Sequence, residues 1–317
     1  MTATADISRR QAWVIAARPQ TLPAGGAPVI IGVALAVADG VFAPIPAVAA
    51  LVGALLIQIG TNFANDYYDA VNGADTEERE GFTRVTAGGL IDPSRVKLAM
   101  IATYAVAMAV GLYLVYVGGL PILVVGLSSI LAGLAYTGGP YPYGYHGLGD
   151  LFVFVYFGLV AVAGTYYVQA VTAVGIEPLP LWIPDGTVTA ASLLAGVAAG
   201  ALATAILVVN NIRDMETDRE TGKRTLAVML GYRLSRGEFC GLVILAYAVP
   251  VVFWAGLGYN LAVLLPLLSV PLALKISATV LTRKDGAALN PALERTGQLL
   301  AVYALLFGAG LLVPGLI

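Results

Sequence analysis

Two acidic segments of this chain share one spacing. The first begins at Asn65 and the second at Asn210, and when these asparagines are aligned, Asp69 falls on Asp214 and each segment carries further carboxylates. Carboxylates gathered in a low-dielectric setting repel one another unless cations screen them. Mg²⁺ suits such a place because it takes hard oxygen ligands, usually one or two carboxylates together with substrate phosphates. The two segments therefore predict the binding of a diphosphate through Mg²⁺.

Basic residues follow directly after both acidic segments. Arg79 and Arg84 follow the first, and Lys223 and Arg224 follow the second, so each segment has donors for the outer oxygens of a diphosphate. A single aspartate in a polar loop is usually a solvated residue, and a basic group near a membrane span can serve topology alone. Two matching acidic segments with matching basic neighbours favour a functional site over that simpler interpretation.

A third loop, from Tyr136 to Asp150, is rich in tyrosine and contains no lysine or arginine. Its tyrosines are either ordinary interfacial residues or a wall whose ring faces would stabilise a carbocation beside an ionising diphosphate. Asp150 also favours a helix N-terminus on dipole grounds alone. Gln58 and Gln169 lie within apolar stretches, and we expect their amides to face the interior of a helix bundle.

The composition shows which elements must position these loops. Of 317 residues, 59% are hydrophobic and only 11% are charged, whereas about a quarter are charged in soluble proteins. This excludes a soluble globular domain and a disordered chain, and the single cysteine, Cys240, excludes a disulfide scaffold. Long charge-free runs predict one all-α membrane domain over residues 1–317. The nine expected spans are about 21–38, 45–64, 98–117, 121–137, 150–172, 190–210, 238–256, 260–281 and 297–316.

The basic residues predict the orientation of these spans. All 17 lysines and arginines fall in four groups, and nine spans place every group on the same side of the membrane. By the positive-inside rule that side is cytoplasmic. We therefore expect a multi-pass protein of the cytoplasmic membrane, with its N-terminus and active site facing the cytoplasm and its C-terminus outside. Asn65 and Asn210 are 145 residues apart with an even number of spans between them, which indicates a parallel internal repeat.

These motifs resemble those of the UbiA-type intramembrane aromatic prenyltransferases, and within that family the 1,4-dihydroxy-2-naphthoate polyprenyltransferases of menaquinone synthesis. The resemblance covers nearly the whole chain and rests on four motifs in order: Ala17 to Leu22, Asn65 to Asp75, Gly138 to Asp150, and Asn210 to Gly231. It implies nine helices around a central cavity. It also implies Mg²⁺-dependent transfer of a polyprenyl group from an allylic polyprenyl diphosphate to dihydroxynaphthoate, with loss of diphosphate and CO₂, giving demethylmenaquinone.

The resemblance further implies roles for individual residues. By position, the metal ligands are the aspartates of the two acidic segments, and Asp69, Asp214 and Asp218 are the catalytic ones among them. Tyr143 and Asp150 are candidates for holding the hydroxyl or carboxyl groups of the acceptor, because they lie at the cytoplasmic mouth. The metal set is Asp66, Asp69, Asp75, Asp214 and Asp218, and the substrate-binding set is Asn65, Arg79, Arg84, Tyr141, Asn210 and Lys223.

The choice of acceptor depends on the tyrosine loop. Hydroxybenzoate prenyltransferases of the family carry Tyr-Pro-x-x-Lys-Arg after the fourth span, whereas here no basic residue follows Tyr141-Pro142 and the loop ends in Gly147-Leu148-Gly149-Asp150. Hydroxybenzoate, homogentisate and a glycerol-based archaeal lipid precursor remain alternative acceptors. A CDP-alcohol phosphotransferase would require an Asp-Gly-x-x-Ala-Arg motif, which is absent. A secondary transporter would place its buried acids near the membrane midplane, not at the helix ends.

Overall fold

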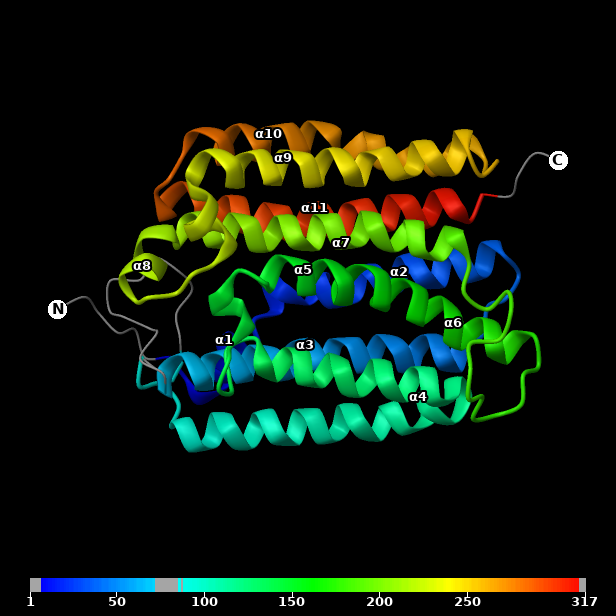
Figure 1. Ribbon diagram of the computed structural model, residues 1–317, viewed down its shortest axis with the longest axis horizontal. Coiled ribbons are helices and arrows are strands. Elements are labelled where there is room, and N and C mark those ends of the chain that lie inside the picture. The colour runs from blue at the N-terminus through cyan, green and yellow to red at the C-terminus, as the bar shows by residue number, and fades with distance from the viewer. Residues whose placement is uncertain (1–6, 72–84, 87, 314–317) are drawn as a thin grey trace.

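The computed structural model describes residues 7–71, 85–86 and 88–313, and the regular elements within these residues are all helices. They lie alongside one another, close to the long axis of the molecule (Figure 1). The α-helices are α1 (Arg9–Ala17), α2 (Leu22–Ala38), α3 (Pro44–Val71), α4 (Pro93–Ala135), α5 (Gly149–Phe154), α6 (Ala161–Ala173), α7 (Ala190–Arg213), α8 (Met215–Glu220), α9 (Leu226–Ala255), α10 (Val270–Thr282) and α11 (Gly286–Leu311). The other helical segments are η1 (Pro19–Thr21), η2 (Tyr143–His146) and η4 (Leu261–Ser269), which are 3₁₀-helices, and η3 (Val155–Val160), which is a π-helix.

Seven stretches of the described chain are long and apolar enough to cross a membrane. The sequence predicted nine spans, and the difference arises at two helices. The 43-residue α4 covers two of the expected spans, and α11, which covers the ninth, contains the charged pair Glu294-Arg295 and is not among the seven. The prediction of an all-helical membrane protein is confirmed, and the number nine stays a prediction. The seven stretches are Arg9–Ala38, Pro44–Val71, Pro93–Ala135, Gly149–Ala173, Ala190–Arg213, Leu226–Ala255 and Leu261–Thr282.

Helix α4 is broken at Gly119, where the backbone has φ 65° and ψ −151°. This left-handed region is costly for residues with a Cβ atom, so glycine is needed there. A Cβ at Gly119 would also lie 1.8 Å from the carbonyl oxygen of Pro180. The same carbonyl accepts a hydrogen bond from the N–H of Leu120 at 2.9 Å. The loop before α7 therefore packs into the break and holds the two halves of α4 against each other.

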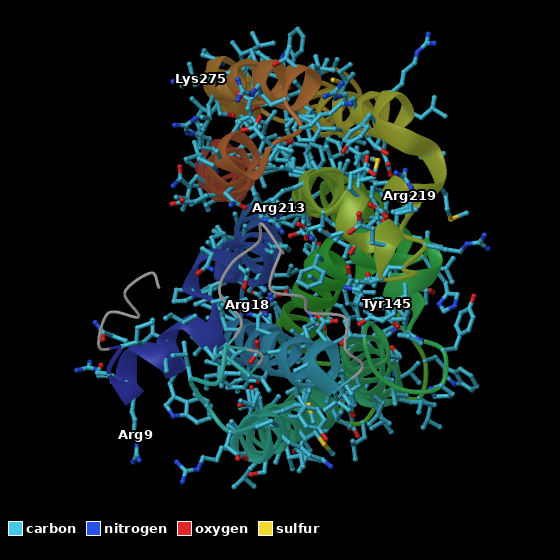
Figure 2. The ribbon with its side chains drawn as sticks, turned by 90° about the vertical axis from the view of Figure 1, so that its left-hand side faces the viewer. Arg9, Arg18, Tyr145, Arg213, Arg219 and Lys275 are labelled. Atoms are coloured by element: carbon cyan, nitrogen blue, oxygen red, sulfur yellow. The ribbon has the colours of Figure 1, made fainter. Side chains whose placement is uncertain are left out.

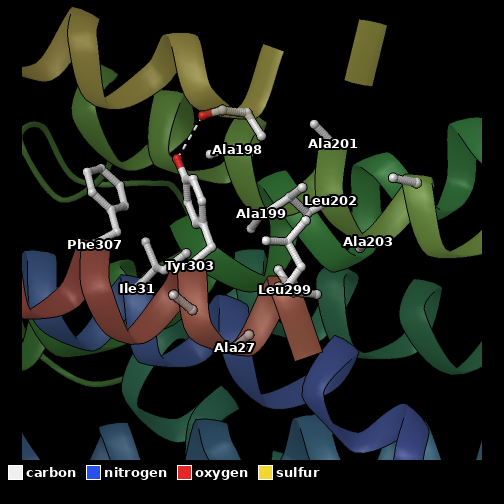
Figure 3. Packing of buried hydrophobic residues seen from close by; sticks show 14 of the residues in the cluster. Ala27, Ile31, Ala198, Ala199, Ala201, Leu202, Ala203, Leu299, Tyr303 and Phe307 are labelled. Carbon is white, nitrogen blue, oxygen red and sulfur yellow. Dashed lines mark hydrogen bonds between the residues drawn. The ribbon is translucent and has the colours of Figure 1, made fainter. Parts of the chain in front are cut away.

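The main hydrophobic core surrounds α7, the most buried of the seven apolar stretches. Tyr303 and Phe307 of α11, Ile31 of α2 and Leu202 of α7 belong to this core, and many of its other members are alanines (Figure 3). Small residues allow helices in a membrane to approach closely, and association there depends on such packing. The hydroxyl of Tyr303 donates a hydrogen bond to the carbonyl oxygen of Ala246 at 2.7 Å, which ties α11 to α9. Helix α7 is thus a rigid centre for the bundle.

The π-helix η3 packs its backbone directly on α7. A Cβ atom at Gly158 would lie 2.5 Å from the carbonyl oxygen of Gly196 and 2.5 Å from Cα of Gly200. π-helical turns are rare and often lie at functional sites. This one places Tyr156 and Phe157 along the cavity described below.

We predict that Gly158→Ala lowers the free energy of unfolding by about 1–3 kcal/mol, the usual cost of extra atoms in a filled interface. The matched control is Gly241→Ala on α9, where an added Cβ meets no atom within 4 Å. This control should be neutral or slightly stabilising, because alanine favours a helix over glycine. Thermal unfolding midpoints of the purified proteins in detergent measure both effects. Equal midpoints for the two variants would contradict the close packing of η3 on α7.

Candidate functional site

Three segments that are far apart in the sequence meet at one end of the bundle. They are the last turns of α3, the tyrosine loop around η2, and the junction of α7 with α8 (Figure 1). Seen from this end, Arg18, Tyr145 and Arg213 lie around the middle of the bundle, whereas Arg9 lies at its periphery (Figure 2). The fold thereby brings the two acidic segments to one place.

Lys223 connects the two acidic segments. Its Nζ atom lies 3.9 Å from Oδ1 of Asp69 and 3.7 Å from Oδ1 of Asp218. All three side chains are buried, and the backbone N–H of Lys223 donates to the carbonyl oxygen of Asp218 at 2.8 Å. A buried carboxylate is costly unless a positive charge and hydrogen bonds compensate it. Lys223 therefore places one positive charge beside both carboxylates.

Tyr145 of η2 adds a second link to this group. Its hydroxyl donates to Oδ1 of Asp69 at 2.5 Å, and the ammonium of Lys223 lies 4.8 Å from the centre of its ring. The carbonyl oxygen of Tyr145 accepts the N–H of Arg224 at 2.8 Å. The tyrosine loop is thus fastened to both acidic segments. The sequence analysis did not single out Tyr145, because nothing in the loop distinguishes it from Tyr141 and Tyr143.

Arg213 organises the second acidic segment. Its Nε and Nη2 atoms each donate to one oxygen of Asp214 at 2.7 Å, which is a bidentate pair. Nη2 also donates to Oδ1 of Asn210 at 2.9 Å, and Nη1 donates to Oδ1 of Asn290 on α11 at 2.8 Å. In the sequence Arg213 is recognisable only as a topological charge. Its position directly before Asp214 does not predict this pair, because adjacent side chains on a helix do not normally face each other.

The first acidic segment has two kinds of surroundings. Asn65 accepts a hydrogen bond from the hydroxyl of Thr137 at 3.0 Å and lines the cavity described next. Asp66 accepts from the backbone N–H and hydroxyl of Thr86 at 3.2 and 2.7 Å, and Arg18 lies 3.9 Å from its other oxygen. Asp66 is absent from the lining of that cavity. These contacts indicate that Asp66 anchors Thr86, and its metal role stays a prediction.

A cavity of about 540 Å³ lies between the helices. Its polar end contains Asp69, Asp214, Asp218 and Lys223, and from there it continues between α3, α4 and α6. The walls along that course are apolar, with side chains such as Ile57, Met108, Leu112, Leu123 and Val168. A polar end joined to a long apolar space fits a ligand with a charged head and a hydrocarbon tail.

The residues predicted to hold the acceptor are not all at the cavity. Tyr143 lines it, stacks on Phe152 with a ring distance of 4.2 Å, and donates its hydroxyl to a backbone carbonyl at 2.8 Å. Burial raises the pKa of the Tyr143 hydroxyl above its ordinary value, so the phenol is neutral at neutral pH. Asp150 is buried but does not line the cavity, and its Oδ2 atom has no hydrogen-bond partner within the described chain. Tyr141 is exposed and stacks on His146 at 3.8 Å.

The glutamines predicted to face the interior of the bundle do so. Both are buried. Gln58 lines the cavity and donates from Nε2 to the hydroxyl of Thr21 at 3.1 Å, while Gln169 donates to the carbonyl oxygen of Thr165 at 2.8 Å. The sequence analysis did not predict that Gln58 borders the cavity, because interior orientation alone does not identify a ligand-facing residue.

The predicted metal set is only partly visible in this part of the chain. Asp75, Arg79 and Arg84 lie outside the described residues. Across residues 7–71, 85–86 and 88–313, no three His, Cys, Asp or Glu side chains are close enough to form a metal site by themselves. Asp69 and Asp218, which line the cavity beside Lys223, nonetheless fit Mg²⁺, because this ion commonly binds one or two carboxylates and completes its ligands with phosphate oxygens. These residues therefore suit a cation that arrives with a diphosphate. Both oxygens of Asp214 accept hydrogen bonds from Arg213, and its metal role stays a prediction.

Comparison with known proteins places this geometry in a family. Residues 26–302 match the UbiA prenyltransferase family. The chain is 39% identical over 312 residues to the 1,4-dihydroxy-2-naphthoate octaprenyltransferase of Escherichia coli (strain K12), covering 96% of both chains.

Two solved structures share the fold. The apo structure of a UbiA homolog from Aeropyrum pernix K1 matches with a TM-score of 0.65 at 15% identity, covering 90% of this chain and 97% of that one. A UbiA homolog from Archaeoglobus fulgidus bound to DMAPP and Mg²⁺ matches with a TM-score of 0.58 at 16% identity, covering 93% and 98%. At these identities the likeness shows the fold alone.

We predict that Arg213→Ala lowers the free energy of unfolding by about 3–5 kcal/mol, because it leaves the buried carboxylate of Asp214 without its partner. The matched control is Arg219→Ala, since Arg219 pairs with Glu216 at the exposed surface of α8. Exposed pairs contribute about 1 kcal/mol or less. Thermal unfolding in detergent compares the two variants, and an Arg213→Ala protein as stable as Arg219→Ala would contradict the structural role of Arg213.

Proposed function

The chain belongs to the UbiA prenyltransferase family, and from that membership we propose that it transfers a polyprenyl group from an allylic polyprenyl diphosphate to 1,4-dihydroxy-2-naphthoate. Diphosphate and CO₂ are released, and the product is a demethylmenaquinol, the reduced hydroquinone form of a demethylmenaquinone. The observation that carries this proposal is the cavity in which Asp69, Asp218 and Lys223 form a charged end to a long apolar space. The acceptor follows from the 39% identity with the Escherichia coli enzyme over 96% of the chain.

The charged end would hold the diphosphate. Asp69, Asp214 and Asp218 are the residues that would bind Mg²⁺, and Lys223 is placed to contact a phosphate oxygen. Bound Mg²⁺ would neutralise charge on the diphosphate and so improve it as a leaving group. Arg213 orients the carboxylate of Asp214 through its two hydrogen bonds. Asn65, Asn210, Arg79 and Arg84 remain proposed diphosphate contacts, and Asp66 and Asp75 remain proposed metal ligands.

The apolar space would hold the prenyl chain and exclude water. The allylic C–O bond breaks so that its electron pair leaves with the diphosphate, and the resulting carbocation alkylates the electron-rich naphthoate ring. The ring then loses its carboxyl group as CO₂ and regains aromaticity. Tyr136 and Tyr143 both line the cavity, and their ring faces are suited to stabilise the cation. Burial raises the pKa of the Tyr143 hydroxyl, so this ring does not become an anionic nucleophile that would trap the cation. Asp150 and Tyr141 remain proposed acceptor contacts.

We further propose that the chain crosses the cytoplasmic membrane nine times, as a single domain with a parallel internal repeat. Two observations support this: α4 is broken at Gly119 into two halves, and α11 extends along α7 (Figure 1). Helix α11 ends at the opposite end of the bundle from α1 and α8 (Figure 1). The N-terminus and the acidic segments would then face the cytoplasm, and the C-terminus the outside.

The activity is tested with purified protein, octaprenyl diphosphate, Mg²⁺ and an equimolar mixture of dihydroxynaphthoate and hydroxybenzoate. We expect mass spectrometry to find a prenylated naphthalenediol, or the naphthoquinone that air oxidation forms from it during work-up, and we expect its formation to stop with EDTA. Asp218→Asn should lower kcat/KM by at least about 100-fold, the scale at which lost electrostatic stabilisation acts. Glu216→Gln, on the exposed face of α8, should change it about twofold or less. A prenylated hydroxybenzoate would support the proposed diphosphate site but contradict dihydroxynaphthoate as the acceptor. The absence of any product would contradict the proposed prenyl transfer.

The orientation is tested by labelling single cysteines in a Cys240→Ser background, since Cys240 is the only cysteine. Asp185 precedes α7 and Glu220 ends α8, so they lie at opposite ends of the bundle, and both are exposed. In intact cells a membrane-impermeant maleimide should label Asp185→Cys, and it should label Glu220→Cys only after permeabilisation. The reverse pattern would contradict a cytoplasmic active site.

A further inference from the structure

Two kinds of glycine line the cavity. Gly25 and Gly133 are packing glycines: a Cβ at Gly25 would lie 3.3 Å from Cβ of Gln58, and one at Gly133 would lie 2.5 Å from Oγ1 of Thr61. The second kind has open space where a side chain would begin. A Cβ built on any of these residues meets no atom within 4 Å, and we call them the open glycines: Gly53, Gly111, Gly126 and Gly164.

Neither packing nor backbone conformation requires glycine at these positions. All four lie in helices, on α3, α4 and α6, and none has a positive φ. Glycine in a helix interior stabilises the helix less than alanine does. Each open glycine therefore lowers the stability of its helix, and no packing contact of its own compensates for this. Because glycine has no side chain, the space at these positions in the cavity wall is not filled by the protein. The open glycines therefore widen the apolar space.

The open glycines lie at different depths from the charged end. Gly126 precedes Tyr136 by ten residues on α4, which is about 15 Å at the helical rise of 1.5 Å per residue. Gly53 precedes Asp69 by 16 residues on α3, or about 24 Å. Tyr136 and Asp69 line the same end of the cavity, since Thr137, which follows Tyr136, donates its hydroxyl to Asn65 one helical turn before Asp69. Gly126 is thus nearer the charged end, and Gly53 is farther along the same cavity.

We propose that the open glycines determine the longest isoprenoid chain that the cavity accepts, an inference that rests on the prenyl transfer proposed above. A branched isoprenoid chain needs room for a methyl group at each unit, and its transfer from water is favoured only where the apolar wall contacts it without overlap. A side chain at Gly126 would obstruct the chain after its first units, and one at Gly53 would obstruct only longer chains. Depth along the cavity then corresponds to chain length.

The experiment measures turnover with geranyl, farnesyl, geranylgeranyl and octaprenyl diphosphates. The variants are Gly126→Leu, Gly53→Leu and the matched control Gly241→Leu, which lies on α9, is exposed, and also has no atom within 4 Å of an added Cβ. In Gly126→Leu the ratio of octaprenyl to geranyl activity should fall at least about tenfold, as expected when a side chain occupies volume that the ligand needs. In Gly53→Leu the same ratio should fall, while the ratio of farnesyl to geranyl activity stays within about twofold of the unmodified protein.

The control and a smaller substitution separate the outcomes. Gly241→Leu should keep all ratios of the unmodified protein. Gly126→Ala, which adds one methyl group, should show a smaller fall than Gly126→Leu and replaces it if the leucine variant does not fold. Unchanged ratios in every variant of an active enzyme would overturn this inference and leave the proposed function standing. No product from the unmodified protein with any donor would overturn the proposed function and this inference with it.

Discussion

The contacts of Lys223 with Asp69 and Asp218 join the two halves of the site. The two aspartates are 149 residues apart in the sequence, and each would be costly to bury alone. One ammonium between them compensates both charges, and Tyr145 adds a hydrogen bond and a ring face to the same group. The last turns of α3, the tyrosine loop and α8 are therefore held in one arrangement by a single buried cation. A diphosphate with its own cation fits this end of the cavity, because the carboxylates of Asp69 and Asp218 can face the cation while the ammonium of Lys223 faces the diphosphate.

The rest of the bundle supports that end and shapes the space behind it. Helix α7 packs against α2, α9 and α11 through small residues, so the second acidic segment begins from a rigid position. Arg213 extends this rigidity by linking Asp214 to Asn290 of α11. The π-helix η3 and the broken α4 supply the walls of the apolar space, which is why glycines recur there in two roles. Charge thus orients the head of the ligand, and helix packing limits its tail.

The sequence was sufficient for the helical class, the pairing of the acidic segments and the position of Lys223 beside them, because these depend on composition and spacing. It did not reveal the partner of each carboxylate. Asp66 and Asp69 are three residues apart, yet Asp66 accepts hydrogen bonds from Thr86 while Asp69 faces the cavity. Tyr145, which was not predicted, donates its hydroxyl to Asp69, whereas the predicted Tyr141 is exposed and stacks on His146. Such differences depend on loop conformation and on contacts between distant helices, which local periodicity does not encode.

The most direct test of the account is a crystal structure with Mn²⁺ in place of Mg²⁺ and a prenyl thiodiphosphate as the unreactive donor. Anomalous scattering would locate the metal, and the ligand density would trace the chain. We expect a metal peak on the cavity side of Asp69 and Asp218, between these carboxylates and the diphosphate, with the diphosphate beside Lys223 and the prenyl chain passing Gly126 toward Gly53. A metal peak away from both aspartates, or a prenyl chain outside the apolar cavity, would contradict it.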